Sequence, residues 1–216
     1  MRDPEGTITS WVGLNLDITE RKAEAERLAV ISAELDHRVK NILATVSTIT
    51  RMTGRSATSL DVYRDTLQAR IRAMAAAHRQ LADADWQGMS LERLIATEID
   101  AYRASRTDSI RMEGPEVQLP PALVQTLALA FHELTTNSSK YGALSKEEGQ
   151  LDIMWRTEDG LQIDWIETGL TGIGLPATTG FGTTLLTRIL AAQGASVTMD
   201  YPDTGIRVRI SLSGLL

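Results

Sequence analysis

The feature that most constrains the fold of this chain is a seven-residue repeat of apolar side chains that runs in two stretches, 28–49 and 60–81. The repeat comprises Leu28, Leu35, Ile42, Ile49, Leu60, Leu67, Met74 and Leu81. Because an α-helix has about 3.6 residues per turn, such a repeat places one apolar stripe along a helix. We expect a first helix over 19–52, ended by Thr53 and Gly54, and a second helix that begins near Ser59. A short loop between them predicts an antiparallel hairpin, and two hairpins could pair into a four-helix bundle.

His37 lies in the middle of the first predicted helix and away from its apolar stripe. With 100° between successive residues, its side chain is more than a right angle from the centre of the stripe. Lys40 and Asn41 share this outer face, and Asp36 and Arg38 flank the histidine. An imidazole that faces water in the middle of a helix has no packing role there, so we expect it to be available to react.

Composition excludes several classes of function. The 216 residues, 43% of them hydrophobic, suffice for one domain or two small ones. A net charge of −6 provides no basic surface for nucleic acid, and the absence of cysteine excludes disulfides and thiolate chemistry. The three histidines are far apart and show no zinc spacing. Because no apolar run reaches the roughly 20 residues of a membrane helix and no signal peptide is visible, we expect a cytoplasmic protein without a membrane partner.

Residues 1–18 have the pattern of a single strand. Apolar side chains occupy even positions between Ile8 and Ile18, and one strand cannot form a sheet by itself. Asp17 is then expected to cap the first helix, with Glu20 in its first turn. We therefore interpret 1–18 as the end of a preceding domain.

Beyond residue 88 the pattern changes to short strands and helices. Helices are expected over 90–102, 121–140 and 182–192, and strands over 109–112, 116–119, 151–156, 161–166, 196–201 and 206–212. The inward positions of the first two helices are Leu91, Leu94, Ile95 and Ile99, and Leu123, Leu127, Ala130 and Leu134. Helices against a mostly antiparallel sheet form an α+β sandwich. We accordingly predict a hairpin domain over 19–87 and an α+β domain over 88–216.

The helix predicted over 121–140 carries Glu133, Asn137 and Lys140 on one flank of its buried stripe. A carboxylate, an amide oxygen and an ammonium group suit a hydrated magnesium ion with its phosphates. An ordinary solvated polar face has the same pattern, and for this helix alone it is the better interpretation.

Glycine-rich segments later in the chain favour a binding site at Glu133, Asn137 and Lys140 over an ordinary solvated face. One strand ends at Glu167 and is followed by Gly169, Gly172 and Gly174, and the Gly180-Phe181-Gly182 turn leads into a helix. Glycines before a helix N-terminus let backbone amides approach phosphate groups. Each segment alone is a weak signal, but their order after the Glu133 helix is much more specific.

These motifs together resemble those of sensor histidine kinases of the HWE type, over nearly everything beyond residue 17. The residues that carry the resemblance lie at 35–41, 131–145, 165–167 and 180–182. His132 and the triplet Trp165-Ile166-Glu167 are the two features that name this family. The resemblance implies a dimerisation and phosphotransfer hairpin followed by a Bergerat-type (GHKL) ATP-binding domain. The segment before the first helix resembles the last strand of a PAS sensor domain.

The resemblance also implies roles for individual residues. His37 would accept a phosphoryl group from ATP and pass it to an aspartate of a response regulator receiver domain, with Arg38, Lys40 and Asn41 beside it. Asn137 would hold Mg2+, with Glu133 holding the ion or its waters, and Glu167 would accept a hydrogen bond from the adenine amine. The remaining nucleotide-binding positions would be His132, Lys140, Tyr141, Gly169, Gly172, Gly180, Phe181 and Gly182.

Several alternatives stay open on the sequence alone. The proton acceptor for His37 is either Asp36 or Glu133. His132 is a surface residue, a hydrogen-bond partner of the site or a contact to the hairpin, whereas His78 and Trp165 are expected to be packing residues.

The same sequence admits other functions and another assembly. A non-catalytic scaffold that binds nucleotide, or an ATPase of the Bergerat fold without phosphohistidine, would share most of these motifs. The hairpins predict a homodimer, but a monomer in which another domain covers the apolar stripe would serve as well.

Overall fold

The computed structural model describes residues 16–103, 107–170, 187–191 and 193–213, together with the isolated residues Glu5 and Gly13. The side chains of Glu34, His37, Arg38, Asn41, Ser56 and Thr107 lie outside this description. Of the strand expected over 8–18, residues 13 and 16–18 are described, and these four are not in a strand; the others lie outside the description. Backbone contacts divide the chain into two compact units, Met1–Ser47 and Thr48–Leu216, and each unit is described by itself.

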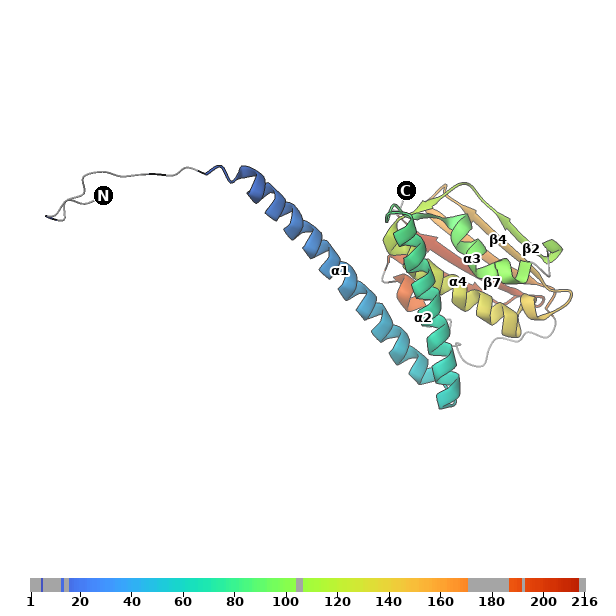
Figure 1. Cartoon of the computed structure of the whole chain (residues 1–216). Coiled ribbons are helices and arrows are strands. Elements are labelled where there is room, and N and C mark those ends of the chain that lie inside the picture. Colours follow the sequence, from blue (N-terminus) through green and yellow to red (C-terminus); the bar gives the residue numbers. More distant parts are fainter. Residues whose placement is uncertain are drawn as a thin grey trace. The chain divides into compact units, whose positions relative to one another are not determined.

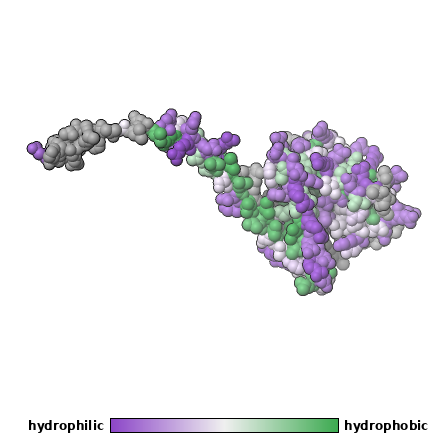
Figure 2. All heavy atoms as spheres, viewed as in Figure 1, coloured by the Kyte–Doolittle hydropathy of each residue, from purple (hydrophilic) through white to green (hydrophobic). Residues whose placement is uncertain are grey.

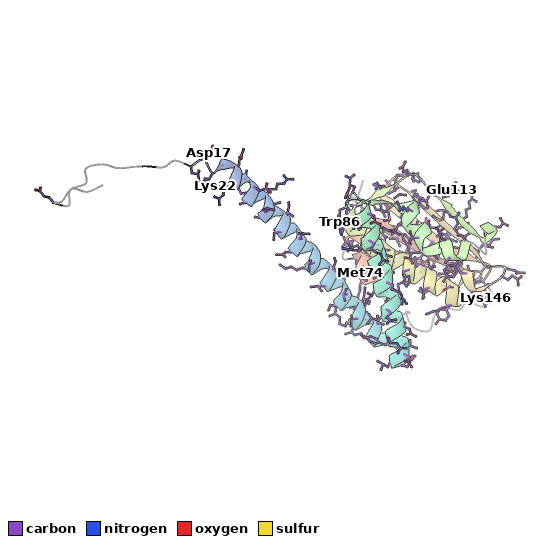
Figure 3. All side chains as sticks on the ribbon, in the orientation of Figure 1. Asp17, Lys22, Met74, Trp86, Glu113 and Lys146 are labelled. Atoms are coloured by element: carbon purple, nitrogen blue, oxygen red, sulfur yellow. The ribbon has the colours of Figure 1, made fainter. Side chains whose placement is uncertain are left out.

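Helix α1 spans Thr19–Ser56 and confirms the first predicted helix. As expected, Asp17, which is labelled in Figure 3, lies just before this helix, and its carboxylate accepts a hydrogen bond from the Thr19 amide at 2.9 Å. This bond lowers the pKa of Asp17. The predicted end at 52 is wrong by four residues, because α1 continues through Gly54. Its last turn belongs to the second unit, where the Thr53 hydroxyl donates to the Ile49 carbonyl oxygen at 2.6 Å.

Helix α2 spans Leu60–Asp83 and starts where the sequence predicts it. The Ser59 hydroxyl caps it by accepting a hydrogen bond from the Val62 amide at 3.2 Å. Its buried side is formed by Arg70, Ala73, Met74, Ala77 and Leu81. A tight turn follows, in which Asp85 and Trp86 have positive φ angles of 48° and 58°.

The remaining elements form the predicted α+β arrangement (Figure 1). A five-stranded sheet has the order β2 (Ile110–Glu113), β4 (Gln150–Arg156), β5 (Leu161–Thr168), β7 (Ile206–Leu212) and β6 (Ala195–Asp200). The β2 and β4 strands are parallel, and every other pair is antiparallel. A small second sheet, which the sequence did not indicate, pairs β1 (Met89–Ser90) with β3 (Gln118–Leu119).

Helices α3 (Leu91–Arg103) and α4 (Pro121–Tyr141) cover one face of the five-stranded sheet (Figure 1). All eight inward positions predicted for these helices are buried. Helix α4 is buried on nearly every side, because the sheet lies against one side and α2 packs against another. Of the third predicted helix, residues 187–191 are described and are helical.

The apolar repeat of the two long helices is only partly buried. Ile49, Met74 and Leu81 are buried inside the second unit, so part of the stripe is covered within one chain. On α1, by contrast, Leu28 and Leu35 expose 57% and 56% of their surface, and Figure 2 shows hydrophobic residues gathered along this helix. No helix in the described part of the chain is both long and apolar enough to cross a membrane.

Candidate functional site

Glu167 is buried near the end of β5, on the side of the sheet that the helices cover. Three hydrogen bonds reach its carboxylate. Trp165 Nε1 donates to Oε1 at 2.8 Å, while the Ser138 hydroxyl and the Ala143 amide donate to Oε2 at 2.9 and 2.6 Å. All three donors are uncharged, and no ion pair of the described residues includes Glu167.

The chain segment after α4 encloses this carboxylate. The Ser138 hydroxyl, on the last turns of α4, accepts a hydrogen bond from the Leu144 amide at 3.2 Å while it donates to Glu167. The short 3-10 helix Ala143–Ser145 therefore closes over the end of β5. Gly142 has to be glycine here, since a Cβ atom at this position would collide with the Glu167 carboxylate. The motif that follows the α4 helix thus builds the wall around Glu167.

Glu133 also lies buried on α4, but it is held from a different side. Arg70 of α2 donates from Nε to Oε1 and from Nη2 to Oε2, each at 2.7 Å, in a bidentate ion pair. The third nitrogen of Arg70 donates to the Thr53 hydroxyl at 2.7 Å. Glu133, which the sequence suggested as a magnesium ligand or proton acceptor, therefore has both carboxylate oxygens bonded to Arg70 of α2.

Sequence reasoning did not single out Arg70. Its position between Leu67 and Met74, on the inner side of α2, was the available signal. An arginine on an inward-facing side of a helix needs a buried acidic partner, but the sequence does not indicate which one.

Asn137 and Lys140 are exposed on α4, as is Tyr141 beyond them. Among the described residues no three acidic or histidine side chains form a ready metal cluster. Magnesium keeps several waters and binds proteins through one or two groups plus substrate phosphates, so one amide and one nearby carboxylate fit such an ion. Asn137 offers an exposed amide oxygen to such an ion, whereas Glu133 would first have to exchange its contacts with Arg70.

The Glu167 carboxylate has the capacity to accept a hydrogen bond from an adenine amine. The carboxylate keeps accepting capacity on Oε1, because only one of its three hydrogen bonds goes to that oxygen. In addition, the buried Thr135 hydroxyl, on the same face of α4 as Ser138, finds no hydrogen-bond partner within the described part of the chain. A buried hydroxyl of this kind requires a partner that the described residues do not supply, such as a water molecule or a ligand.

The other candidate residues have the following places. His132 contacts Glu98 of α3 through Nδ1 at 3.0 Å, so its observed partner is neither the hairpin nor Glu167. His78 packs edge-on against Trp86, with ring centroids 4.9 Å apart, and confirms the packing role expected for it. Trp165 is fully packed, as expected, but its hydrogen bond to Glu167 was missed.

Asp36 and Lys40 are exposed on α1, in the first unit. The side chains of His37, Arg38 and Asn41 are outside the described part of the structure, and so are Gly172, Gly180, Phe181 and Gly182. Gly169 is described, has a positive φ of 76° and follows β5 directly.

Comparisons with known proteins show which family and fold this chain resembles. A model of the HWE histidine kinase family matches residues 34–116. The blue-light-activated histidine kinase 1 of Erythrobacter litoralis is 33% identical over 219 residues, which is 96% of this chain and 60% of the relative. The blue-light-activated histidine kinase of Brucella anthropi is 33% identical over 95% of this chain and 43% of its own length. The chain thus spans about half the length of these curated relatives.

Two solved structures share the fold. The Erythrobacter litoralis EL346 blue-light-activated histidine kinase superposes with a TM-score of 0.60 and 18% identity, covering 84% of this chain and 58% of that one. The histidine kinase domain of the same protein gives a TM-score of 0.54 and 16% identity, over 79% and 95% of the two chains. At these identities the likeness concerns the fold, which is that of a histidine kinase.

Proposed function

We propose that the chain is an ATP-dependent protein-histidine kinase of a two-component system, because residues 34–116 match the HWE histidine kinase family and a relative of 33% identity is a histidine kinase. It would phosphorylate its own His37 and pass the phosphoryl group to an aspartate of a response regulator receiver domain. The observation that carries the proposal is the buried Glu167 carboxylate, held by neutral donors at the junction of α4 and β5. A Bergerat-fold ATPase would share this carboxylate but has no use for a histidine on an exposed helix, whereas only an assay separates a kinase from a nucleotide-binding scaffold.

The nucleotide would be held by groups on α4 and β5. Glu167 would accept a hydrogen bond from the adenine amine, and Asn137 and Glu133 would hold Mg2+ or its waters. A bound magnesium ion neutralises charge on the phosphate oxygens during transfer. By the family resemblance, the phosphate side would be lined by Lys140, Tyr141, Gly169, Gly172, Gly180, Phe181 and Gly182, with His132 as a further nucleotide-binding position.

In the reaction a ring nitrogen of His37 attacks the γ-phosphorus of ATP. The nitrogen–phosphorus bond forms as the bond to the leaving oxygen of ADP breaks, and the ring loses a proton. An unperturbed imidazole has a pKa of about 6.5, so most of it is neutral and nucleophilic near pH 7. Asp36 and Glu133 are the two candidate proton acceptors. Glu133 would first have to exchange its contacts with Arg70.

The whole protein would combine this module with a sensor and a partner. Residues 1–18 are proposed to be the last strand of a PAS-type sensor, since Asp17 caps the helix that leaves it. The exposed apolar side chains of α1 support a homodimer. ATP and receiver domains both occur in the cytoplasm, where we therefore place the protein.

Incubation with γ-labelled ATP tests the proposed function directly. The chain should acquire a label that is lost in acid and stable in base, as a phosphohistidine is, and His37→Gln should bind ATP normally but carry no label. The wild type without ATP serves as the blank. Label on His37→Gln would reject His37 as the acceptor. ATP binding with no label on the wild type would indicate a scaffold, and hydrolysis with no label would indicate an ATPase.

A further inference from the structure

Three carboxylates are buried in the described part of the chain, and they differ in their partners. Glu133 is paired with Arg70, and Asp164 is paired with Arg209 at 2.7 Å. Glu167 has no arginine, lysine or histidine partner in the described part of the chain, although it is as deeply buried as Glu133. Burial without a cation is costly for a carboxylate, so a purely structural residue at this position would be better uncharged. The charge of Glu167 is therefore expected to serve a ligand.

The three hydrogen bonds leave the carboxylate little freedom. An ionised carboxylate offers about four lone-pair positions. Ser138 and Ala143 use both positions of Oε2, and Trp165 uses one position of Oε1. The Ser138 hydroxyl accepts from the Leu144 amide, which directs its own proton toward Glu167. The one position that remains lies on Oε1, beside the indole nitrogen of Trp165.

We propose that Trp165 and Ser138 are positioning residues that hold Glu167 in the one orientation in which its free Oε1 lone pair accepts a hydrogen bond from a nucleotide amine. This inference rests on the proposed function, in which Glu167 contacts the adenine ring. Adenine presents an amino group at its six position, whereas guanine presents a carbonyl oxygen there. A carboxylate fixed in this way attracts the amine and repels the carbonyl oxygen, so Trp165 and Ser138 set the preference for ATP over GTP.

The spacing of Trp165 and Glu167 follows from strand geometry. Residues two apart on a strand point to the same side of the sheet, so the indole and the carboxylate stand next to each other on β5. A phenylalanine at 165 would fill most of the same volume but could not donate a hydrogen bond. Glu167 would then lose one of its three hydrogen-bond donors, and its carboxylate could rotate or bind a water molecule.

The test compares the dissociation constants of ATP and GTP by calorimetry for the wild type, Trp165→Phe, Ser138→Ala and Glu167→Gln. Hydrogen bonds to a charged group are strong, so we expect the ATP preference to fall roughly tenfold in Trp165→Phe and in Ser138→Ala. Trp155→Phe is the matched control, because Trp155 is also buried and donates from Nε1, but to the Pro115 carbonyl oxygen at 2.7 Å. This control should lower stability and leave the nucleotide preference unchanged.

The outcomes separate the inference from the function on which it rests. An unchanged preference in Glu167→Gln would reject the contact with adenine itself. A changed preference in Glu167→Gln, with no change in folded Trp165→Phe and Ser138→Ala, would reject only the positioning role. If Trp165→Phe does not fold, Ser138→Ala decides. Trp165→Phe combined with Glu167→Gln should lose no more preference than Glu167→Gln alone, because both changes act through one carboxylate; additive losses would overturn the proposal.

Discussion

Single residues on α4 have different tasks although they lie within two turns of one another. Glu133 is buried between α4 and α2, Ser138 supports Glu167, and Asn137 is exposed between them in the sequence. An exposed amide contributes little to the folded core, so a change at Asn137 separates ligand binding from stability. The three residues show how one helix contributes to packing and to a site at once.

Asn137→Ala should therefore keep the melting temperature of the nucleotide-free protein and lose the rise that Mg-ATP produces. A ligand that binds only the folded state stabilises it by about 2.7 kcal/mol at one hundred times its dissociation constant. Thermal melts of both proteins with and without Mg-ATP measure this difference. The same rise in both proteins would show that Asn137 does not hold the metal, and a lower melting temperature without nucleotide would show a structural role.

At the level of elements, one buried arginine ties three helices together. Arg70 contacts Thr53 at the end of α1 and Glu133 on α4, so the turn of the hairpin and the α+β core share one polar network. Both charged side chains are almost fully buried, at 4% and 7% exposure. Arg70 and Glu133 depend on each other, because removing either side chain leaves the other as a buried charge without a compensating partner.

Arg70→Met should lower the free energy of unfolding by about 3–5 kcal/mol, since it leaves Glu133 buried and unpaired. Adding Glu133→Leu to this variant should recover most of the loss, because the second change removes the buried charge. Urea unfolding measures both effects. The half-exposed pair of Arg209 with Asp164 is the control, and Arg209→Met should cost less. A double variant no more stable than Arg70→Met would contradict the explanation.

At the level of the whole molecule, α1 differs from an ordinary surface helix because it exposes a stripe of large apolar side chains. Leu28, Leu35, Val39 and Leu43 each expose more than half of their surface. Covering such side chains contributes about 1.5–3 kcal/mol each when burial is complete. Met74 and Leu81 of α2 already pack inside their own chain, so a partner would cover the exposed part of the stripe, which lies mainly on α1 and includes Leu60 of α2.

We expect a homodimer in which this stripe is covered by a second copy of the chain. Light scattering over a concentration series should give about twice 23.6 kDa at micromolar protein. The charged variant Leu28→Glu with Leu35→Glu should dissociate to monomers. Met154→Glu, at an exposed apolar residue of β4, should remain a dimer. A wild-type mass near 23.6 kDa would mean that the chain is monomeric, as the alternative assembly supposes.

The sequence by itself determined the elements and their inward sides. Ser59 caps α2 where expected, and the inward residues of α3 and α4, such as Ile95 and Leu127, are all buried. These features depend on the periods of helix and strand, which repeat over a few neighbouring residues. The order of Glu133, Asn137, Glu167 and the later glycines also indicated a nucleotide site before any fold was known.

Only the tertiary structure decided which side chains meet. Arg70 and Glu133 are 63 positions apart, and Ser138 and Glu167 are 29 apart. No local period encodes such a pair, because it depends on how α2, α4 and β5 pack. For the same reason, the sequence predicted a stripe on α2 but not that part of this stripe lies against the chain's own α4 helix.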